Sequence, residues 1–321
     1  MRRRVVRSLC ALVALSMLLA APVAVAQPKP AEPPKAATAI GTGGAAATVD
    51  ATATRAATAA LRRGANAVDA AIVAAAVLGV TEPYSCGIGG GGFMTVYRAA
   101  TGRVTTIDSR ETAPAAFRPT SLLDPTTGEP LDFDETVTSG LGVGVPGTVR
   151  GWEEALRRYG TWPLRRALRP AIGVARDGFP VDETFHAQTE DNAERFANFG
   201  STRALYLTKG GKARPVGSVQ RNRDLAATYR RLATGGAKAF YEGRMARDVV
   251  ATARRPPVRR GASATIRPGV MATGDLSDYQ ARVRRPAGVG YRGLDVYGMA
   301  PPSSGGSTVG VGHRARREIA V

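Results

Sequence analysis

The sequence predicts an α+β fold, in which helices and strands occupy separate stretches of the chain. A pair of helical segments precedes two short β-like runs, and a second strand pair follows a long, mainly helical stretch. A doubly wound fold would instead need strands and helices that alternate regularly, and this chain lacks that order. We find no internal repeat. The 321 residues suffice for one large domain or two ordinary domains.

Hydrophobic periodicity and turn residues divide the chain into its elements. The predicted helices cover residues 51–61, 67–78, 148–159, 162–176, 182–197, 222–233 and 242–254. The predicted strands cover residues 93–98, 104–108, 289–292 and 294–299. The first two strands are joined by a short turn at Thr101 and Gly102, which predicts a β-hairpin.

Local signals support the boundaries of the helices. Asn66 can cap the second helix, which is apolar on nearly every face except at Asp69. Such a helix is expected inside a core, and at about a dozen residues it is too short to cross a membrane. We expect Gly79 to end this helix and Thr161 to cap the helix over residues 162–176.

The two ends of the chain differ in composition from its middle. Residues 1–26 combine an arginine-rich start, an apolar run and a small-residue cleavage site, which predicts a signal peptide and export to the periplasm or the medium. Residues 27–40 are rich in Pro and Ala and predict an extended linker. Residues 41–310 form the predicted domain, and residues 311–321 form a basic tail.

The net charge of +18 is carried almost entirely by arginine, because only five of the 44 cationic residues are lysines. This bias is typical of a GC-rich coding sequence. A nucleic-acid site would combine clustered cations with a recognisable module, and the arginine run at residues 254–267 contains no aromatic residue. We therefore expect no nucleic-acid partner, and a basic polyanion-binding protein remains an alternative.

A glycine-rich loop follows the second predicted helix. Gly87, Gly89 and Gly92 match the G-x-G-x-x-G pattern of dinucleotide-binding proteins, and Asp108 lies downstream. In those proteins, however, the loop follows a strand and opens a helix, which is the reverse of the order here. We interpret the loop as a place where the backbone comes close to another chain segment or to a ligand.

Few residues offer nucleophilic or metal-binding chemistry. Cys86 is the one cysteine left after removal of the leader, and we expect it to fill a small buried site, although a single exported cysteine can also be reactive. His186 and His313 are too few to build a zinc site. His186 is expected at the surface, and no G-x-S-x-G motif is present. The sequence predicts neither a metal nor a cofactor.

Arg110 lies at the exit of the predicted hairpin, between Asp108 and Glu111. An arginine at a strand end can bind a carboxylate through two parallel hydrogen bonds, which lysine cannot reproduce. Spacing alone favours a structural ion pair with Asp108 or Glu111, and a ligand-binding role remains open.

Taken together, the motifs resemble those of the γ-glutamyltransferases, also called γ-glutamyltranspeptidases or glutathione hydrolases. The similarity runs from about residue 41 to residue 310. The matching stretches begin at the numbered positions and are GANAVDAA (64), GVTEP (79), GIGGG (87), IDSRETAP (107), GVPGT (144), ARDGF (175), YRG (291) and PPSSGG (301).

This resemblance implies an N-terminal-nucleophile hydrolase with an αββα sandwich, of which the chain holds only the large-subunit part. The family's exported precursor cuts itself in two, and the new N-terminal Thr of the small subunit attacks the γ-carbonyl of glutathione or another γ-glutamyl compound, with its own amine as base. An oxyanion hole stabilises the intermediate. Water, an amino acid or a peptide then takes the acyl group, and no metal or organic cofactor is needed.

The resemblance also assigns a role to Arg110, which matches the arginine of the family's R-E-x-A-P stretch. That arginine binds the α-carboxylate of the γ-glutamyl group, so the resemblance favours the ligand-binding role over the ion pair. The glycine loop then belongs to the core framework.

The chain departs from the family pattern where the nucleophile is expected. The family carries it in a Thr-Thr-His-type segment, whereas the Thr105-Thr106 and Thr126-Thr127 pairs here are followed by other residues and lie in the wrong region. Ser303 and Ser304 belong to the large-subunit part and do not replace it. We therefore expect no catalytic residue in this chain, a missing small subunit, and no activity of the chain alone.

The tail over residues 311–321 is basic where the family continues as an apolar helix, which suggests a frameshift or an early stop in the gene. Two alternatives within the family remain open. The first is an acylase that acts on β-lactam side chains, and the second is a non-catalytic fragment that depends on a partner.

Overall fold

The computed structural model describes residues 40–310 and residue 312. The chain divides into two units, Met1–Ile40 and Gly41–Val321, and apart from Ile40 all described residues belong to the second unit. The predicted signal peptide and nearly all of the predicted linker and basic tail lie outside the described residues. Within the described ranges, no helix combines the length and the apolar composition that crossing a membrane requires.

The second unit contains helices along most of its length, interrupted by short strands. The α-helices with bounds inside the described residues are α2 Ala51–Arg62, α3 Ala67–Thr81, α4 Phe133–Thr138, α5 Thr148–Tyr159, α6 Leu164–Ala167, α7 Arg169–Asp177, α8 Glu183–Asp191, α9 Ala193–Ala197, α10 Gly200–Tyr206, α11 Arg223–Gly235, α12 Lys238–Tyr241, α13 Gly243–Arg254 and α14 Thr273–Ser277. The 3₁₀ turns are η1 Ala99–Thr101, η2 Pro119–Leu122 and η3 Gly140–Gly142. The strands are β1 Phe93–Arg98, β2 Arg103–Asp108, β3 Phe179–Pro180, β4 Val219–Gln220, β5 Arg282–Arg284, β6 Ala287–Tyr291 and β7 Leu294–Gly298.

Three strands form an antiparallel sheet in the order β1-β2-β5. The predicted hairpin is confirmed, with Phe93 opposite Asp108 and a turn through Gly102 in the left-handed region at φ 61°. The second predicted hairpin is also confirmed as β6–β7. β5 was not predicted, because its pairing of Asp108 with Arg282 joins segments far apart in the sequence.

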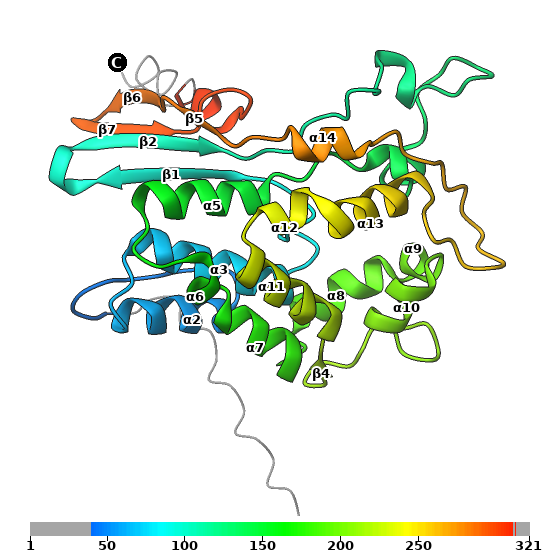
Figure 1. The fold of residues 1–321 in the computed structure, drawn as a ribbon, viewed down its shortest axis with the longest axis horizontal. Coiled ribbons are helices and arrows are strands. Elements are labelled where there is room, and N and C mark those ends of the chain that lie inside the picture. Colours follow the sequence, from blue (N-terminus) through cyan, green and yellow to red (C-terminus); the bar gives the residue numbers. More distant parts are fainter. Residues whose placement is uncertain (1–39, 311, 313–321) are drawn as a thin grey trace, which may run out of the picture. The chain divides into compact units, whose positions relative to one another are not determined.

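Helices pack against one another and against the sheet to form the main core. Figure 1 shows α5 lying along the β1–β2 hairpin, and α5 contacts both β2 and α3. α3 in turn packs against α2 and α7. Ile72, Val73 and Val77 of α3 and Val149 of α5 are fully buried in one cluster. The prediction that α3 lies inside a core is therefore confirmed.

α3 is longer than the sequence predicts. Gly79 does not end the helix, which continues to Thr81 and stops before Pro83. A Cβ atom at Gly79 would lie 2.7 Å from the hydroxyl oxygen of Tyr229. That hydroxyl donates a 3.0 Å hydrogen bond to the carbonyl of Ala76. The glycine therefore serves a close helix–helix contact, and its helix-breaking tendency is overridden by packing.

Asp69 joins α3 to the segment that follows α5. Asn66 caps α3 as predicted, in a capping box where Asn66 Oδ1 accepts from Asp69 N and Asp69 Oδ2 accepts from Asn66 N, both at 3.0 Å. Asp69 Oδ1 also accepts from the backbone N–H groups of Thr161 at 2.9 Å and Trp162 at 3.0 Å. Burial opposes ionisation of Asp69, but these hydrogen bonds and that from the Thr161 hydroxyl hold its pKa below the usual value.

The expectation that Thr161 caps a long helix is wrong, since both its N–H and its hydroxyl bind Asp69. The predicted helix over 162–176 is instead two helices, α6 and α7, with Pro170 in the first turn of α7. Proline has no N–H to continue the helical ladder, which explains the interruption. The predicted helix over 182–197 is likewise divided into α8 and α9 at Asn192.

Candidate active site

The glycine loop connects α3 to β1 and packs against backbone on two sides. Gly92 and Ser109 exchange backbone hydrogen bonds of 3.1 and 2.9 Å. A Cβ atom at Gly91 would lie 2.4 Å from the Ser109 carbonyl oxygen and 2.7 Å from the Glu111 nitrogen. The carbonyl of Gly90 accepts from Gly147 N at 2.8 Å. Of the two predicted roles, close approach to another chain segment is confirmed, and this contact fixes the backbone on both sides of Arg110.

The Arg110 backbone is held at both of its polar groups. Its N–H donates to Asp108 Oδ1 at 3.1 Å, and its carbonyl accepts from the Tyr279 hydroxyl at 2.7 Å. Asp108 is only 7% exposed and also accepts from Arg284 Nε at 2.7 Å. The Tyr279 ring stacks on Tyr241 with 5.9 Å between centroids. Burial, followed by the nearby carboxylates of Asp108 and Glu111, raises the pKa of Tyr279, so its hydroxyl stays a donor near neutral pH.

The Arg110 side chain is far less constrained than its backbone. It is 58% exposed, and its Nε lies 3.8 Å from Glu111 Oε2. That distance is too long for a hydrogen bond, and exposed ion pairs contribute only about 0–1 kcal/mol. An ion pair with Asp108 is wrong, since Asp108 pairs with Arg284. Among the described residues the guanidinium makes no hydrogen bond, which leaves its donors available to a ligand.

Arg110 lines an open cavity of about 660 Å³. One wall is the stretch from Arg110 to Pro114 with Gly89, and the other wall comes from η2, α4 and η3. The lining residues are Gly89, Arg110, Glu111, Thr112, Ala113, Pro114, Phe117, Leu122, Thr136, Val137, Leu141, Gly142, Val143 and Gly144. A mainly apolar cavity of this size with a few convergent polar groups is typical of a small-molecule site.

The second wall of this cavity was not predicted, because the sequence of residues 115–138 shows no regular helix or strand pattern. The missed signal is Asp132, which caps α4 by accepting from Asp134 N at 2.8 Å and from Glu135 N at 3.3 Å. α4 then carries Thr136 and Val137 to the cavity.

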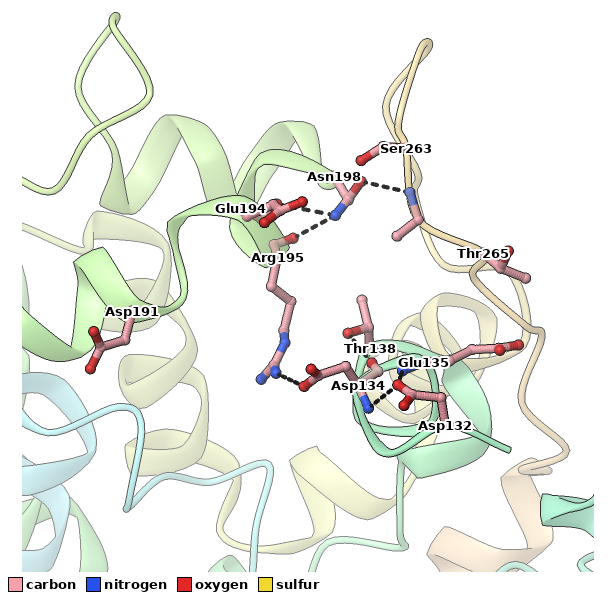
Figure 2. A pocket seen from close by; sticks show the side chains of 11 residues that line it. Asp132, Asp134, Glu135, Thr138, Asp191, Glu194, Arg195, Asn198, Ser263 and Thr265 are labelled. Atoms are coloured by element: carbon pink, nitrogen blue, oxygen red, sulfur yellow. Dashed lines mark hydrogen bonds and ion pairs between the residues drawn. The ribbon is translucent and has the colours of Figure 1, made fainter. Parts of the chain in front are cut away.

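A second cavity, of about 510 Å³, is lined by several carboxylates (Figure 2). Three of its five acids have partners: Asp132 caps α4, Asp134 pairs with Arg195 at 2.7 Å, and Glu135 pairs with Arg267. In the part of the chain that the structure describes, no group of three or more His, Cys, Asp or Glu side chains is placed to hold a metal ion. These contacts give Asp132, Asp134 and Glu135 a structural role.

Neither Cys86 nor His186 has the surroundings of a nucleophile or its base. Cys86 is half-buried and its thiol donates to the carbonyl of Ala75 at 3.7 Å. Burial, followed by the charge of Glu82, raises the pKa of Cys86, which disfavours the reactive thiolate. The expectation of a surface position for His186 is wrong in part, because the ring is half-buried and its Nδ1 lies 2.8 Å from the Arg214 carbonyl oxygen.

Comparisons with known proteins point to one family. The family model described as Gamma-glutamyltranspeptidase matches residues 53–311. A glutathione hydrolase proenzyme of Bacillus subtilis (strain 168) is 37% identical over 246 residues, which are 77% of this chain and 40% of that protein. The Acylase ACY 1 proenzyme of Pseudomonas sp. (strain V22) is 36% identical over 253 residues, 77% of this chain and 42% of that protein.

A crystal structure of the gamma-glutamyltranspeptidase of Helicobacter pylori has a TM-score of 0.77 and 31% identity, covering 85% of this chain and 74% of that one. This likeness defines the class, an α+β protein of the N-terminal-nucleophile hydrolase type, as predicted. The chain belongs to the γ-glutamyltranspeptidase family and covers its large-subunit region. It spans about two fifths of the length of the curated relatives that it matches.

Proposed function

We propose that this chain binds γ-glutamyl compounds such as glutathione in the Arg110 cavity. It would act as the large-subunit part of an enzyme that cleaves γ-glutamyl amides and transfers the γ-glutamyl group to water, amino acids or peptides. The observation that carries the proposal is the state of Arg110. Its backbone N–H and carbonyl are both hydrogen-bonded, whereas its guanidinium is exposed in the cavity and has no hydrogen-bond partner among the described residues.

The α-amino-acid end of a γ-glutamyl group carries a carboxylate and an ammonium on one carbon. Arg110 supplies the planar donor pair that a carboxylate accepts bidentately. Glu111 lies beside it, with its carboxylate 38% exposed, and offers an acceptor for the ammonium. The loose contact of 3.8 Å between the two side chains allows both to turn toward one zwitterionic ligand.

Cleavage requires a nucleophile, and we assign none of the described residues to this role. We propose that a Thr-bearing small-subunit segment supplies it, together with the oxyanion donors, and that neither a metal nor an organic cofactor takes part. The word proenzyme in the name of the Bacillus subtilis relative supports a processed, two-part enzyme. Purified chain alone should release no p-nitroaniline from γ-glutamyl-p-nitroanilide, whereas robust turnover abolished by Arg110→Ala would contradict the need for a separate segment.

We also propose that the precursor is exported through the signal peptide at residues 1–26. The test is fractionation of cells that express the full chain. Recovery from the periplasm or the medium with a new N-terminus near residue 27 supports export, and full-length protein confined to the cytoplasm contradicts it.

The acylase alternative is favoured by the 36% identity to the Acylase ACY 1 proenzyme. A glutaryl group keeps the carboxylate of a γ-glutamyl group but lacks its ammonium, so Glu111 separates the two candidates. We expect L-glutamate to bind more tightly than glutarate, and Glu111→Gln to weaken only glutamate, by about tenfold. Equal binding of both ligands, unchanged in Glu111→Gln, would favour the acylase.

A further inference from the structure

A third cavity, of about 520 Å³, lies between α2 and the α6–α7 region. It shares no lining residue with the Arg110 cavity. Its lining residues are Ala56, Ala60, Arg63, Trp162, Arg166, Arg169 and Pro170. Three of the seven are arginines, and the lining contains no acidic residue.

The three arginines have no counter-charge within the described residues. No carboxylate oxygen of that part of the chain lies within 4.0 Å of Arg63, Arg166 or Arg169, although many other arginines, such as Arg157 and Arg267, are paired with acids. Like charges that share a cavity repel, and the repulsion is relieved when an anion enters between them. The cavity thus concentrates positive charge without compensating it.

Arg166 is held in a geometry that suits an oxyanion. Its guanidinium lies over the Trp162 ring, 3.8 Å from the ring centroid, and its Nη2 donates to the Arg63 carbonyl at 3.3 Å. Stacking covers one face of the guanidinium and leaves N–H groups along its edge. Trp162 is held firmly, because the residue is only 7% exposed and its backbone N–H donates to Asp69 Oδ1 at 3.0 Å.

We propose that this cavity binds a phosphate-type oxyanion, with Arg63, Arg166 and Arg169 as its donors. One carboxylate would neutralise only one of the three positive charges. A phosphate dianion carries two negative charges, and its oxygens can accept hydrogen bonds from several arginines at once. The phosphate could be free inorganic phosphate or the headgroup of an anionic lipid, and both present the same group. This site does not depend on the γ-glutamyl function.

The first test is calorimetric titration of the full chain with inorganic phosphate near neutral pH, at an ionic strength held constant with chloride. We expect saturable binding at one site. Arg166→Gln and Arg169→Gln should each weaken it by about tenfold. Arg169 makes no hydrogen bond through its side chain in the described residues, so its variant is expected to fold. Arg247→Gln on α13 removes the same charge elsewhere and should leave phosphate binding unchanged.

The second test separates the two sources of phosphate. Co-sedimentation with phosphatidylglycerol vesicles but not phosphatidylcholine vesicles, lost in Arg169→Gln, would assign the cavity to a lipid headgroup. Phosphate binding without vesicle binding would assign it to the free anion. The proposal is overturned if phosphate does not bind above the chloride control, or if Arg247→Gln weakens binding as much as Arg166→Gln and Arg169→Gln do.

Discussion

Asp69 and Arg110 are both charged residues within short sequence motifs, yet their side chains have opposite surroundings in the structure. The Asp69 side chain is fully buried and accepts hydrogen bonds from Asn66, Thr161 and Trp162. The Arg110 side chain is exposed and makes no hydrogen bond within the described residues, whereas its backbone is bound at both polar groups.

We interpret this difference as one between a structural charge, Asp69, and the proposed ligand-binding charge, Arg110. A buried carboxylate whose lone pairs are all used inside the fold stabilises the fold and has no capacity left for a ligand. A guanidinium whose position is fixed through its backbone, and whose own donors are open, is prepared for a ligand and contributes little to stability. Substitutions at the two places should therefore change different measurements.

The largest effect on stability is expected from Asp69→Ala. The substitution leaves the backbone N–H groups of Asn66, Thr161 and Trp162 without their acceptor. The hydrogen bonds from Thr161 and Trp162 join segments far apart in the sequence. We expect the free energy of unfolding in urea to fall by about 3–5 kcal/mol. A loss below 1 kcal/mol would mean that the hydrogen bonds of Asp69 contribute little to the stability of the fold.

The stabilising effect of Asp69 should also depend on pH. Because hydrogen bonding lowers the folded pKa of Asp69 below its unfolded value, its contribution is complete above the unfolded pKa of about 4 and is lost as the pH falls through the folded pKa. The stability difference between the wild-type chain and Asp69→Asn should therefore narrow in acid. A difference that stays constant from neutral to acidic pH would contradict this assignment.

The next effect in size is expected from Gly91→Ala, which acts on the support of Arg110. The new Cβ would lie 2.4 Å from the Ser109 carbonyl oxygen, and backbone on both sides leaves little room to adjust. We expect a loss of about 1–3 kcal/mol in stability, together with weaker glutamate binding. The matched control is Gly92→Ala, whose Cβ meets no atom within 4 Å. Equal effects of the two substitutions would remove the steric explanation.

A smaller effect is expected from Tyr279→Phe, which removes the hydrogen bond to the Arg110 carbonyl. We expect a loss of about 1 kcal/mol in stability and a measurable loss of glutamate affinity. Tyr84→Phe removes a part-buried hydroxyl that forms a hydrogen bond with Thr189 instead, and it should leave glutamate affinity unchanged. If both variants bind glutamate like the wild-type chain, Tyr279 does not position Arg110.

The elements with strong local signals were predictable from the sequence. Asn66 as a cap, the β1–β2 hairpin and the helix over residues 148–159 follow from residues close together in the chain, and the structure confirms them. The family resemblance rested on the order of short motifs and is confirmed as well. Arg110 was found in the same way, and its placement in a cavity agrees with the proposed role.

The remaining features depend on contacts that no local pattern contains. Arg284 and Tyr279 reach the Arg110 stretch across about 170 residues of sequence, so neither the Asp108–Arg284 pair nor the Tyr279 hydrogen bond could be predicted. Gly79 and Thr161 were misread for the same reason, because their partners Tyr229 and Asp69 lie in other elements. Tertiary packing there outweighs the local preference of the residue.

Arg110→Gln is expected to change stability least. We propose to titrate the wild-type chain and this variant with L-glutamate by calorimetry and to unfold both in urea. The variant should bind glutamate at least about tenfold more weakly while its free energy of unfolding stays within about 0.5 kcal/mol of the wild-type value. Glutamate binding that is unchanged in Arg110→Gln would contradict the role of Arg110 as the carboxylate-binding residue.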